Sequence, residues 1–296
     1  MRKAIIIFIY NKPEQANLLI EQLLSDKDAD VFIHVDKKYE YLKSQLLKDE
    51  RVIIVNNNIS VDWGSDNLLN AHLLVCKEII KRDIYEYVLT VSGSDMMIRE
   101  GLNEFLEKHK GEVFIDSFEQ DFIRRIYLLR KWPKAMRTLR NNLFDPIRIL
   151  RRFRIELFKR NYPFSKKKVE YDTSNITFYK CYFWFAMPIE VVNYVIKFVE
   201  DNPKFLEIYK GGFVADEGFW ATVIMNSPYK DRITYSDGVA KSLTYYGKFT
   251  RNHHPPTLAM KDIEELEASG KFFARKFDLN EDKEVIDYFY KKILGV

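Results

Sequence analysis

The first 120 residues alternate between short apolar runs and amphipathic stretches, and this rhythm limits the folds open to the chain. Five runs have the length and apolar character of buried parallel strands: 4–9, 31–35, 52–55, 87–91 and 113–116. A helix is predicted from Pro13 and another over 67–82, because apolar residues recur there at helical spacing. Strands and helices in this order predict an α/β fold, a mostly parallel sheet covered by helices on both faces.

The remaining sequence is less regular. It predicts a strand over 182–186, helices over 188–200 and 204–209, a short strand near Ile233 and a final helix from about Asp282. The chain has 296 residues, of which 47% are hydrophobic, which is enough for a large core. We therefore expect a single domain over 1–296, made of two halves, 1–120 and 171–296, with an insert over 121–170.

The cysteines and the first apolar run bear on the compartment. Cys76 and Cys181 form neither a disulfide framework nor a metal-ligand spacing, which is typical of a reducing compartment. The run over 4–9 is much shorter than a membrane span and lacks a small-residue cleavage site. We interpret it as a buried strand and expect a cytoplasmic protein.

Polar turns follow three of the predicted strands. They are Asp36-Lys37-Lys38, Asp62-Trp63-Gly64-Ser65 and Ser92-Gly93-Ser94-Asp95. Taken alone, each turn is better explained by turn chemistry or helix capping than by ligand binding. Together they lie at the carboxyl edge of the predicted sheet, where such folds bind ligands. Neither GxGxxG nor GxxxxGK[ST] occurs, so the sequence gives no support for dinucleotide or P-loop phosphate binding.

Two adjacent carboxylates, Asp216 and Glu217, head an apolar run with helical spacing. Acidic residues are favoured at a helix N-terminus, where they face free N–H groups and the positive end of the helix dipole. A carboxylate fixed in this way also has the chemistry of a general base. The local pattern leaves both interpretations open.

The insert over 121–170 carries an unusual charge. It has 16 Lys and Arg residues against four Asp and Glu, whereas the whole chain has a net charge of only +4. Such a segment indicates an anionic partner or a solvated helical face. Apolar residues such as Trp132 and Phe153 lie among the charges, a combination that also suits contact with an anionic membrane surface. No known nucleic-acid-binding module is present, so we expect no nucleic-acid partner.

Five motifs together resemble the core-2/I-branching glycosyltransferase family, which includes the peptide O-xylosyltransferases. They span nearly the whole chain: His34-Val-Asp-Lys-Lys38, Val61-Asp-Trp-Gly-Ser65, Val91-Ser-Gly-Ser-Asp95, Ala215-Asp-Glu-Gly-Phe-Trp-Ala-Thr222 and Phe272-Phe-Ala-Arg-Lys-Phe-Asp278. The resemblance implies a GT-A fold, a nucleotide-sugar donor and an inverting mechanism. Residues 1–120 then form the nucleotide-binding half, and 171–296 the acceptor and catalytic half.

The resemblance also implies that no divalent metal and no other cofactor is required. Metal-dependent members of the GT-A fold hold the ion with an Asp-x-Asp near the fourth strand. Here that turn reads Ser94-Asp95-Met96-Met97, and hard cations prefer several oxygen ligands to thioethers. In the family, basic side chains near the C-terminus stabilise the leaving diphosphate instead, which assigns this role to Arg275 and Lys276.

The family's catalytic base matches Glu217, and Asp216 is then expected to cap the helix or to orient Glu217. An inverting transfer needs one base on the acceptor side and no covalent nucleophile. Asp36 and Lys38 match the nucleotide-binding positions, with Trp63 and Gly64 as the adjoining wall. Ser94 and Asp95 are expected on the donor side, where Asp95 contacts a sugar hydroxyl. Trp184 is either a wall of the acceptor site or a core residue.

One position departs from the family pattern. Many relatives have a second diphosphate-binding arginine in the strand where this chain has Thr244. Lys241, Lys248 and Arg251 are the candidate replacements, and Arg251 is our choice. His34 is expected to be structural.

The expected activity is metal-independent transfer of a sugar, chiefly N-acetylglucosamine, from a UDP-sugar to a glycan hydroxyl. Xylose and hexose donors remain open. A glycan or lipid-linked glycan acceptor fits a role in cell-surface polysaccharide synthesis, with the enzyme cytoplasmic or peripheral at the inner face of the plasma membrane. The alternatives are a non-catalytic nucleotide-sugar-binding protein and a polyanion-binding protein that acts through the insert.

Overall fold

The computed structural model describes residues 1–296 except 138–141, 143, 237 and 248–254. Its centre is a six-stranded sheet in the order β3-β2-β1-β4-β9-β6. The strands of this sheet are β1 (Lys3–Ile9), β2 (Ala29–Val35), β3 (Val52–Ile54), β4 (Tyr87–Ser92), β6 (Phe114–Ile115) and β9 (Phe185–Pro188). The first four are parallel, while β9 runs antiparallel to both β4 and β6. The prediction of a mostly parallel α/β sheet is therefore confirmed.

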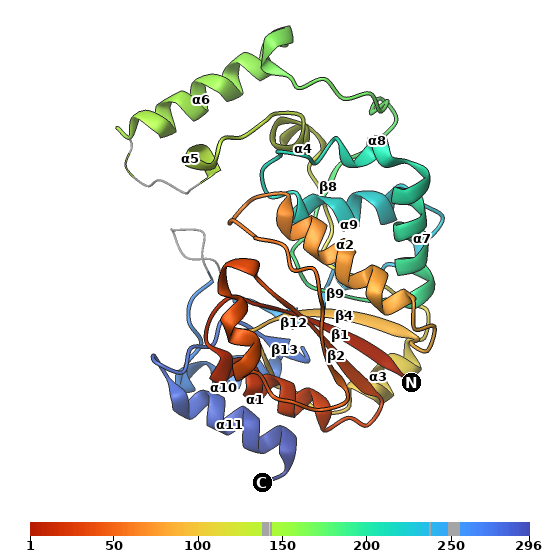
Figure 1. Ribbon diagram of the computed structural model, residues 1–296, viewed down its shortest axis with the longest axis vertical. Coiled ribbons are helices and arrows are strands. Elements are labelled where there is room, and N and C mark those ends of the chain that lie inside the picture. Colours follow the sequence, from red (N-terminus) through yellow and green to blue (C-terminus); the bar gives the residue numbers. More distant parts are fainter. Residues whose placement is uncertain (138–141, 143, 237, 248–254) are drawn as a thin grey trace.

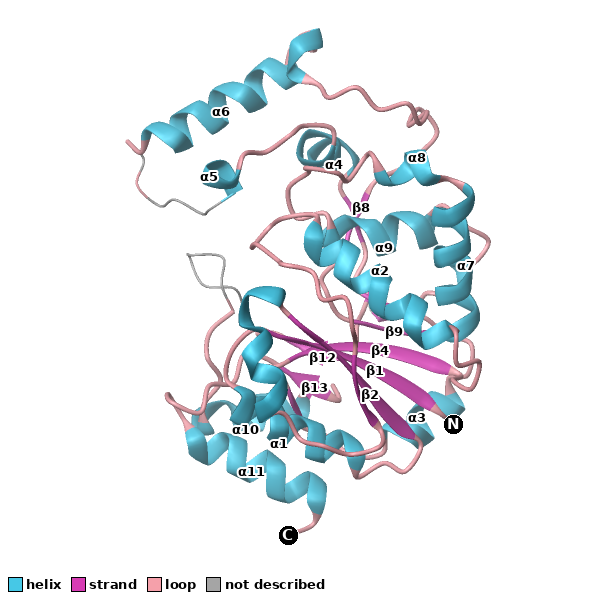
Figure 2. Ribbon diagram, in the orientation of Figure 1, coloured by secondary structure: helices cyan, strands magenta, loops and turns pink. Residues whose placement is uncertain are grey.

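Helices cover both faces of the sheet (Figure 1 and Figure 2). One group contains α2 (Asn67–Ile80), α7 (Ile189–Asp201), α8 (Pro203–Leu206) and α9 (Asp216–Met225). The other contains α1 (Pro13–Leu24), α3 (Leu102–Lys108), α10 (Ile263–Ala268) and α11 (Lys283–Leu294). A separate three-stranded sheet contains β12 (Thr244–Tyr245), which pairs with β13 (Phe273–Ala274), and β5 (Met96–Met97), which pairs with the other side of β13.

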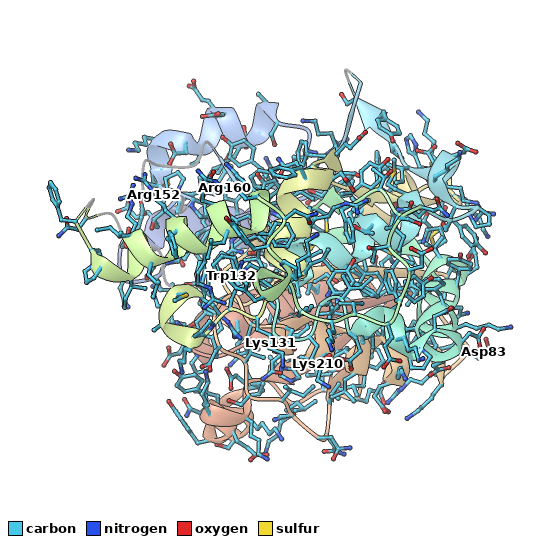
Figure 3. All side chains as sticks on the ribbon, turned by 90° about the horizontal axis from the view of Figure 1, so that it is seen from above. Asp83, Lys131, Trp132, Arg152, Arg160 and Lys210 are labelled. Carbon is cyan, nitrogen blue, oxygen red and sulfur yellow. The ribbon has the colours of Figure 1, made fainter. Side chains whose placement is uncertain are left out.

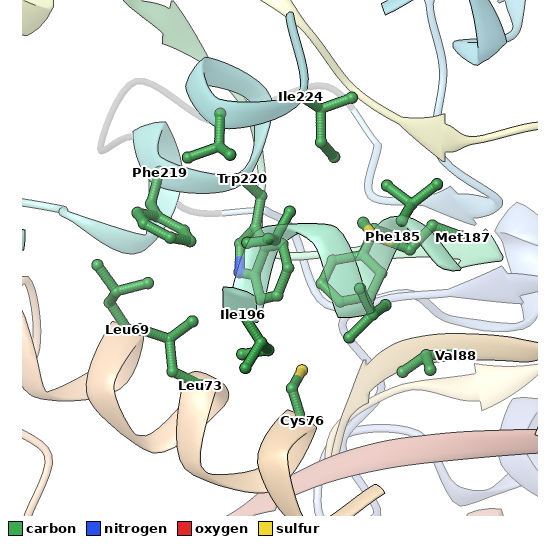
Figure 4. Close-up of a cluster of buried hydrophobic side chains, with 14 of the residues drawn as sticks. Leu69, Leu73, Cys76, Val88, Phe185, Met187, Ile196, Phe219, Trp220 and Ile224 are labelled. Atoms are coloured by element: carbon green, nitrogen blue, oxygen red, sulfur yellow. The ribbon is translucent and has the colours of Figure 1, made fainter. Parts of the chain in front are cut away.

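Strand β1 shows why the chain folds in layers. Its side chains alternate between two apolar clusters, with Ile5 and Ile7 on the α1 and α11 side and Ile6 and Phe8 on the α2 and α9 side. Because successive side chains of a strand point to opposite faces, a strand buried on both faces must be apolar throughout. Figure 4 shows the second cluster, in which Trp220 of α9 lies among side chains of α2, α7 and β9.

Local sequence signals set several helix ends. Pro13 occupies the first turn of α1, where its missing N–H costs nothing. Asp282 caps α11, because its carboxylate accepts a hydrogen bond from the backbone N–H of Val285 at 3.2 Å. That helix ends at Gly295 in the left-handed conformation. These ends confirm the predicted starts of both helices.

The insert is helical, as the sequence predicts. It contains α4 (Asp121–Leu128), α5 (Lys134–Arg137) and α6 (Pro146–Lys159), and α6 lies farthest from the sheet (Figure 1). A small third apolar cluster joins these helices to the main body through Ile126, Trp132, Met136, Phe158 and Phe213. Short pairs complete the structure: β7 (Phe118–Glu119) with β8 (Tyr179–Lys180), and β10 (Tyr235–Ser236) with β11 (Val239–Ala240).

Two sequence-based predictions of secondary structure need correction. The strand expected over 182–186 begins at Phe185 and continues to Pro188, because only that part pairs with β4 and β6. The helix expected over 204–209 is the short α8, which ends at Leu206. The short strand expected near Ile233 is β10, two residues later, while Ile233 itself forms an isolated bridge to Val113.

Candidate active site

A cleft of about 470 Å³ opens at the carboxyl ends of the parallel strands. Segments that lie far apart in the sequence form its walls: the ends of β1, β2 and β4, the loop after β3, the segment before β9, the start of α9 and Arg275 after β13. Two of the three polar turns predicted at this edge contribute most of their residues to the cleft: Asp36 and Lys38 from the first, and Asp62, Trp63 and Gly64 from the second. From the third turn, Ser92 alone lines it.

Asp36 joins the end of β2 to the loop after β3. Its carboxylate accepts hydrogen bonds from the backbone N–H groups of Lys38 at 2.9 Å and Val61 at 3.3 Å. The Lys38 ammonium donates to the Val61 carbonyl at 2.6 Å and to the Asp62 carboxylate at 3.1 Å. Asp36 and Lys38 thus border the cleft and fix its shape, while their role on the nucleotide side stays a prediction.

Trp63 and Gly64 form the adjoining wall. The Trp63 side chain is 54% exposed and meets the Phe213 ring edge-on, with ring centres 5.6 Å apart. Gly64 has φ of +68°, and a Cβ at this position would lie 2.6 Å from the Phe213 ring. Both the left-handed conformation and the close approach therefore require glycine. The Gly64 carbonyl accepts a hydrogen bond from the N–H of Val214, just before α9.

The Asp95 carboxylate is fully buried and holds two cleft residues in place. It accepts hydrogen bonds from the Trp184 indole at 2.9 Å, and from the Ser92 N–H at 2.7 Å and hydroxyl at 2.6 Å. Arg275 lies 3.8 Å away, with its guanidinium carbon 4.6 Å from the centre of the Trp184 ring. Burial raises the pKa of Asp95, while Arg275 and the Ser92 hydrogen bonds oppose the rise.

This placement corrects one expectation. Asp95 lies behind the cleft wall rather than in it, so its carboxylate does not face the space where a sugar hydroxyl would bind. Ser94 and Lys276 also lie outside the cleft lining, and the Lys276 carbonyl accepts from the backbone N–H of Leu258. Arg251 falls outside the described residues.

Trp184 both lines the cleft and is buried, with 6% of its surface exposed. It is therefore both a core residue and part of the cleft wall, while its contact with an acceptor stays a prediction. Its indole stacks on the Tyr246 ring at 5.8 Å and 19°, while Arg275 lies on the same indole. It belongs to the segment before β9 rather than to the strand itself.

Asp216 and Glu217 occupy the first turn of α9, as predicted, and both line the cleft. The helix cap is Ala215, which makes no side-chain capping bond, so the expectation that Asp216 caps the helix is wrong. Asp216 is buried, whereas the Glu217 side chain remains 32% exposed. The Glu217 carboxylate lies 4.0 Å from the Lys180 ammonium. Of the two acids, Glu217 is therefore the one open to a ligand.

The surroundings adjust the acidity of this pair. Burial is the main cause that raises the pKa of Asp216, and the neighbouring charge of Glu217 raises it further. Burial also raises the pKa of Glu217, but the positive charges of Lys180 and Arg124 act against it. A carboxylate with a raised pKa that stays accessible is a stronger proton acceptor than one in water.

Sequence reasoning missed both of these cations. Arg124, from α4 of the insert, is 3% exposed, and its Nε and Nη1 have no hydrogen-bond partner among the described residues. Lys180 lies in β8, and its ammonium is 5.0 Å from the centre of the Tyr182 ring, which lines the cleft. No local sequence pattern indicates a functional role for either residue, because the tertiary fold alone brings their charges near Glu217.

The replacement for the missing second arginine stays a prediction. Thr244 is buried in β12, where it pairs with Phe273 of β13. Lys241 does not reach the cleft lining, and Lys248 and Arg251 fall outside the described residues. His34 is buried and its Nε2 accepts a hydrogen bond from the N–H of Ile59 at 3.0 Å, so it has the structural role expected.

Within the described ranges, no three His, Cys, Asp or Glu side chains gather as ligands for a metal ion. A search of the described helices for one with the length and apolarity to cross a membrane finds none.

Comparisons with known proteins identify the family. The Core-2/I-Branching enzyme family model matches residues 6–267. Xylosyltransferase 1 from Rattus norvegicus is 22% identical and aligns with 100% of this chain and 36% of its own length. Xylosyltransferase 1 from Homo sapiens is also 22% identical, over 98% of this chain and 30% of its own. The chain thus spans about a third of the length of these curated relatives.

Two solved structures have only a distant likeness. The apo structure of the bifunctional glycosyltransferase WbbM has a TM-score of 0.38 and 11% identity, covering 100% of this chain and 50% of its own. Mouse xyloside xylosyltransferase 1, also in its apo form, has a TM-score of 0.33 and 11% identity, over 77% and 83%. Such scores do not establish a shared fold, so family membership rests on the sequence match. By that match, which covers most of its length, the chain belongs to the Core-2/I-Branching enzyme family of glycosyltransferases.

Proposed function

We propose that this protein is an inverting, metal-independent glycosyltransferase that moves a sugar, chiefly N-acetylglucosamine, from a UDP-sugar to a hydroxyl of a glycan. One observation carries the proposal. A single cleft at the carboxyl edge of the sheet contains an accessible carboxylate, Glu217, and a guanidinium, Arg275. The first suits a proton acceptor and the second suits a developing phosphate charge.

The proposed reaction is one displacement at the anomeric carbon. The acceptor oxygen forms the new bond while its proton passes to the Glu217 carboxylate. The bond between the anomeric carbon and the diphosphate oxygen breaks, and its electron pair leaves with UDP. Arg275, fixed by Asp95 and Trp184, then stabilises the added negative charge. Asp36, Lys38 and Trp63 lie where the nucleotide would bind in this arrangement.

Turnover of UDP-N-acetylglucosamine in the presence of EDTA tests the proposal, with UDP-xylose as a parallel donor. We expect transfer or slow hydrolysis without metal, and a loss of roughly 100-fold or more in Glu217→Gln, which is the usual contribution of a general base. Glu190→Gln, at an exposed glutamate on α7, is the matched control. Undiminished activity of Glu217→Gln would contradict the base assignment, and strict Mn²⁺ dependence would contradict the metal-free reaction. Binding of UDP without any turnover would favour a non-catalytic nucleotide-sugar-binding protein.

We further infer that the protein contacts the inner face of the plasma membrane through the insert, where a lipid-linked glycan would be accessible. The outer face of α6 supports this location, because Ile149, Leu150 and Phe153 are 53%, 46% and 59% exposed beside exposed Arg152. Apolar side chains next to cations suit an anionic lipid surface. Co-sedimentation with vesicles of phosphatidylcholine and phosphatidylglycerol should be reduced in Phe153→Ser. Equal binding of the variant and the wild type would contradict the location.

A further inference from the structure

A second cavity, of about 660 Å³, lies between the insert and the segment that follows α8. Seven Lys and Arg side chains line it, and among the described residues that line it Glu207 is the only one with a carboxylate. That carboxylate is already occupied by Lys210, whose ammonium lies 3.2 Å away. The cavity shares no residue with the cleft described above and takes no part in the proposed transfer.

Arg130 is the most informative residue of this cavity. Its side chain is only 5% exposed, and one Nη donates to the backbone carbonyl of Arg154 at 2.9 Å. The Nε has no hydrogen-bond partner among the described residues, and neither does the Nε of Arg154. Burying a charged donor without a partner is costly, so native structures rarely leave one unsatisfied. Arg130 and Arg154 thus bring two positive charges to the cavity, and no carboxylate of the described residues forms an ion pair with either.

The other cations reinforce this arrangement. The Lys167 ammonium donates to the backbone carbonyls of Ile208 and Lys210 at 2.5 and 2.8 Å, which fixes it at the cavity wall. Burial lowers the pKa of Lys167 to about 8, while the negative charges of Asp66 and Glu207 oppose the decrease. Lys131 and Lys210 line the cavity and are exposed, and their labelled side chains are shown in Figure 3.

We propose that this basic cavity binds a phosphate or diphosphate group. The two guanidinium groups present planar N–H donors, the geometry that phosphate oxygens match best, and the lysines add charge without directional demands. The group could belong to a soluble phosphorylated molecule or to a phospholipid headgroup, and both offer the same oxygens to the cavity.

The cavity is also connected to the site of the proposed base. Gly211 lies in its lining, and its carbonyl accepts a hydrogen bond from the backbone N–H of Trp132 at 2.9 Å. Two residues later, Phe213 donates to the Tyr127 carbonyl and packs against Trp63 of the cleft. Asp216 and Glu217 follow in the same segment. An anion bound in the basic cavity would therefore lie beside Gly211, in the loop that leads into α9.

Calorimetric titration with inorganic pyrophosphate at constant ionic strength tests the proposal. The test variant is Lys131→Gln/Lys210→Gln. Its control is Arg152→Gln/Arg160→Gln, on α6 and at its C-terminal cap, which removes the same charge from outside the cavity lining (Figure 3). All four side chains are exposed, so both variants should fold with unchanged melting temperatures. We expect the test variant to bind roughly tenfold or more weakly than wild type, and the control to bind as wild type.

Arg275→Gln separates this cavity from the cleft, because pyrophosphate could also occupy the place of the UDP diphosphate. That variant should keep the cavity's binding even if the proposed transferase activity is wrong. Competition with short-chain dihexanoyl phosphatidylglycerol, below its micelle concentration, identifies the source. Displacement of pyrophosphate points to a lipid headgroup, and no displacement points to a soluble phosphate. Absence of binding in wild type, or equal weakening in test and control variants, would overturn the proposal.

Discussion

Trp184→Phe tests whether the buried network around Asp95 organises the cleft. The change keeps an aromatic ring but removes the indole N–H that donates to the Asp95 carboxylate at 2.9 Å. Because Asp95 is fully buried, no water replaces that donor. A hydrogen bond to a charged group contributes about 1.5–3 kcal/mol, and the smaller ring adds a cavity cost. We therefore expect the free energy of unfolding to fall by at least about 1.5 kcal/mol.

Urea unfolding, followed by circular dichroism, measures this loss as a lower midpoint at unchanged slope. In thermal melts it corresponds to a drop of roughly 3 °C or more for a domain of this size. Trp63→Phe is the matched control, since the exposed indole of Trp63 should be replaced at a cost within about 0.5 kcal/mol. A donor-binding assay adds a second readout, because Arg275 loses its aromatic support and the KM for the UDP-sugar should rise.

The result that would refute this reasoning is a Trp184→Phe protein with wild-type midpoint and wild-type KM. Asp95 would then not depend on the indole, and the position of Arg275 would have another cause. Loss of stability without a change in KM would separate the two roles, leaving Trp184 as a core residue only.

Three further perturbations have signs that follow from the structure. Gly64→Ala should lower the free energy of unfolding in urea more than Gly295→Ala. Both glycines have φ near +68°, but a Cβ at Gly64 would lie 2.6 Å from the Phe213 ring, whereas one at Gly295 would face open space. Equal losses would argue against the clash. Burial lowers the pKa of His72 to about 3, so the neutral ring stabilises the fold fully above pH 6.5, and this contribution is lost as the pH falls towards 3. Melting temperatures should therefore fall less steeply between pH 6.5 and 4 in His72→Gln than in wild type, and parallel curves would contradict this. Lys180→Met removes the cation beside Glu217, which raises the pKa of Glu217 further and should move the acid limit of kcat/KM to higher pH; an unmoved limit would exclude the pairing.

The sequence predicts the central sheet well because its strands are buried on both faces. Strands β1, β2 and β4 are short and mostly apolar, and turn residues follow each of them, which is typical of buried strands rather than helices. The predicted start of β9 lies three residues before the observed start, because the aromatic residues that precede the strand are equally apolar. Their side chains face the cleft and the core rather than a neighbouring strand, a distinction that depends on pairing partners and not on composition.

The sequence predicts site residues that belong to a motif within one segment. It does not predict contacts between side chains from segments that are far apart in the chain. Glu217 at the start of α9 and Asp36 after β2 follow from local pattern and family resemblance, and both line the cleft. The buried position of Asp95 depends on Trp184, which lies 89 residues away along the chain. Arg124 is a similar case, because its charge reaches the acidic pair from a helix of the insert.

The contact between Gly64 and Phe213 has a consequence for how this protein can be altered. The Phe213 ring touches Trp63 on one side and Tyr127 and Trp132 of the insert on the other. One wall of the cleft is therefore built against residues of the 121–170 segment. Excising that segment to obtain a minimal catalytic domain would remove the backing of the wall. Replacing the segment by one of different sequence would likewise reshape the pocket, so changes in this insert are a route to altered substrate preference.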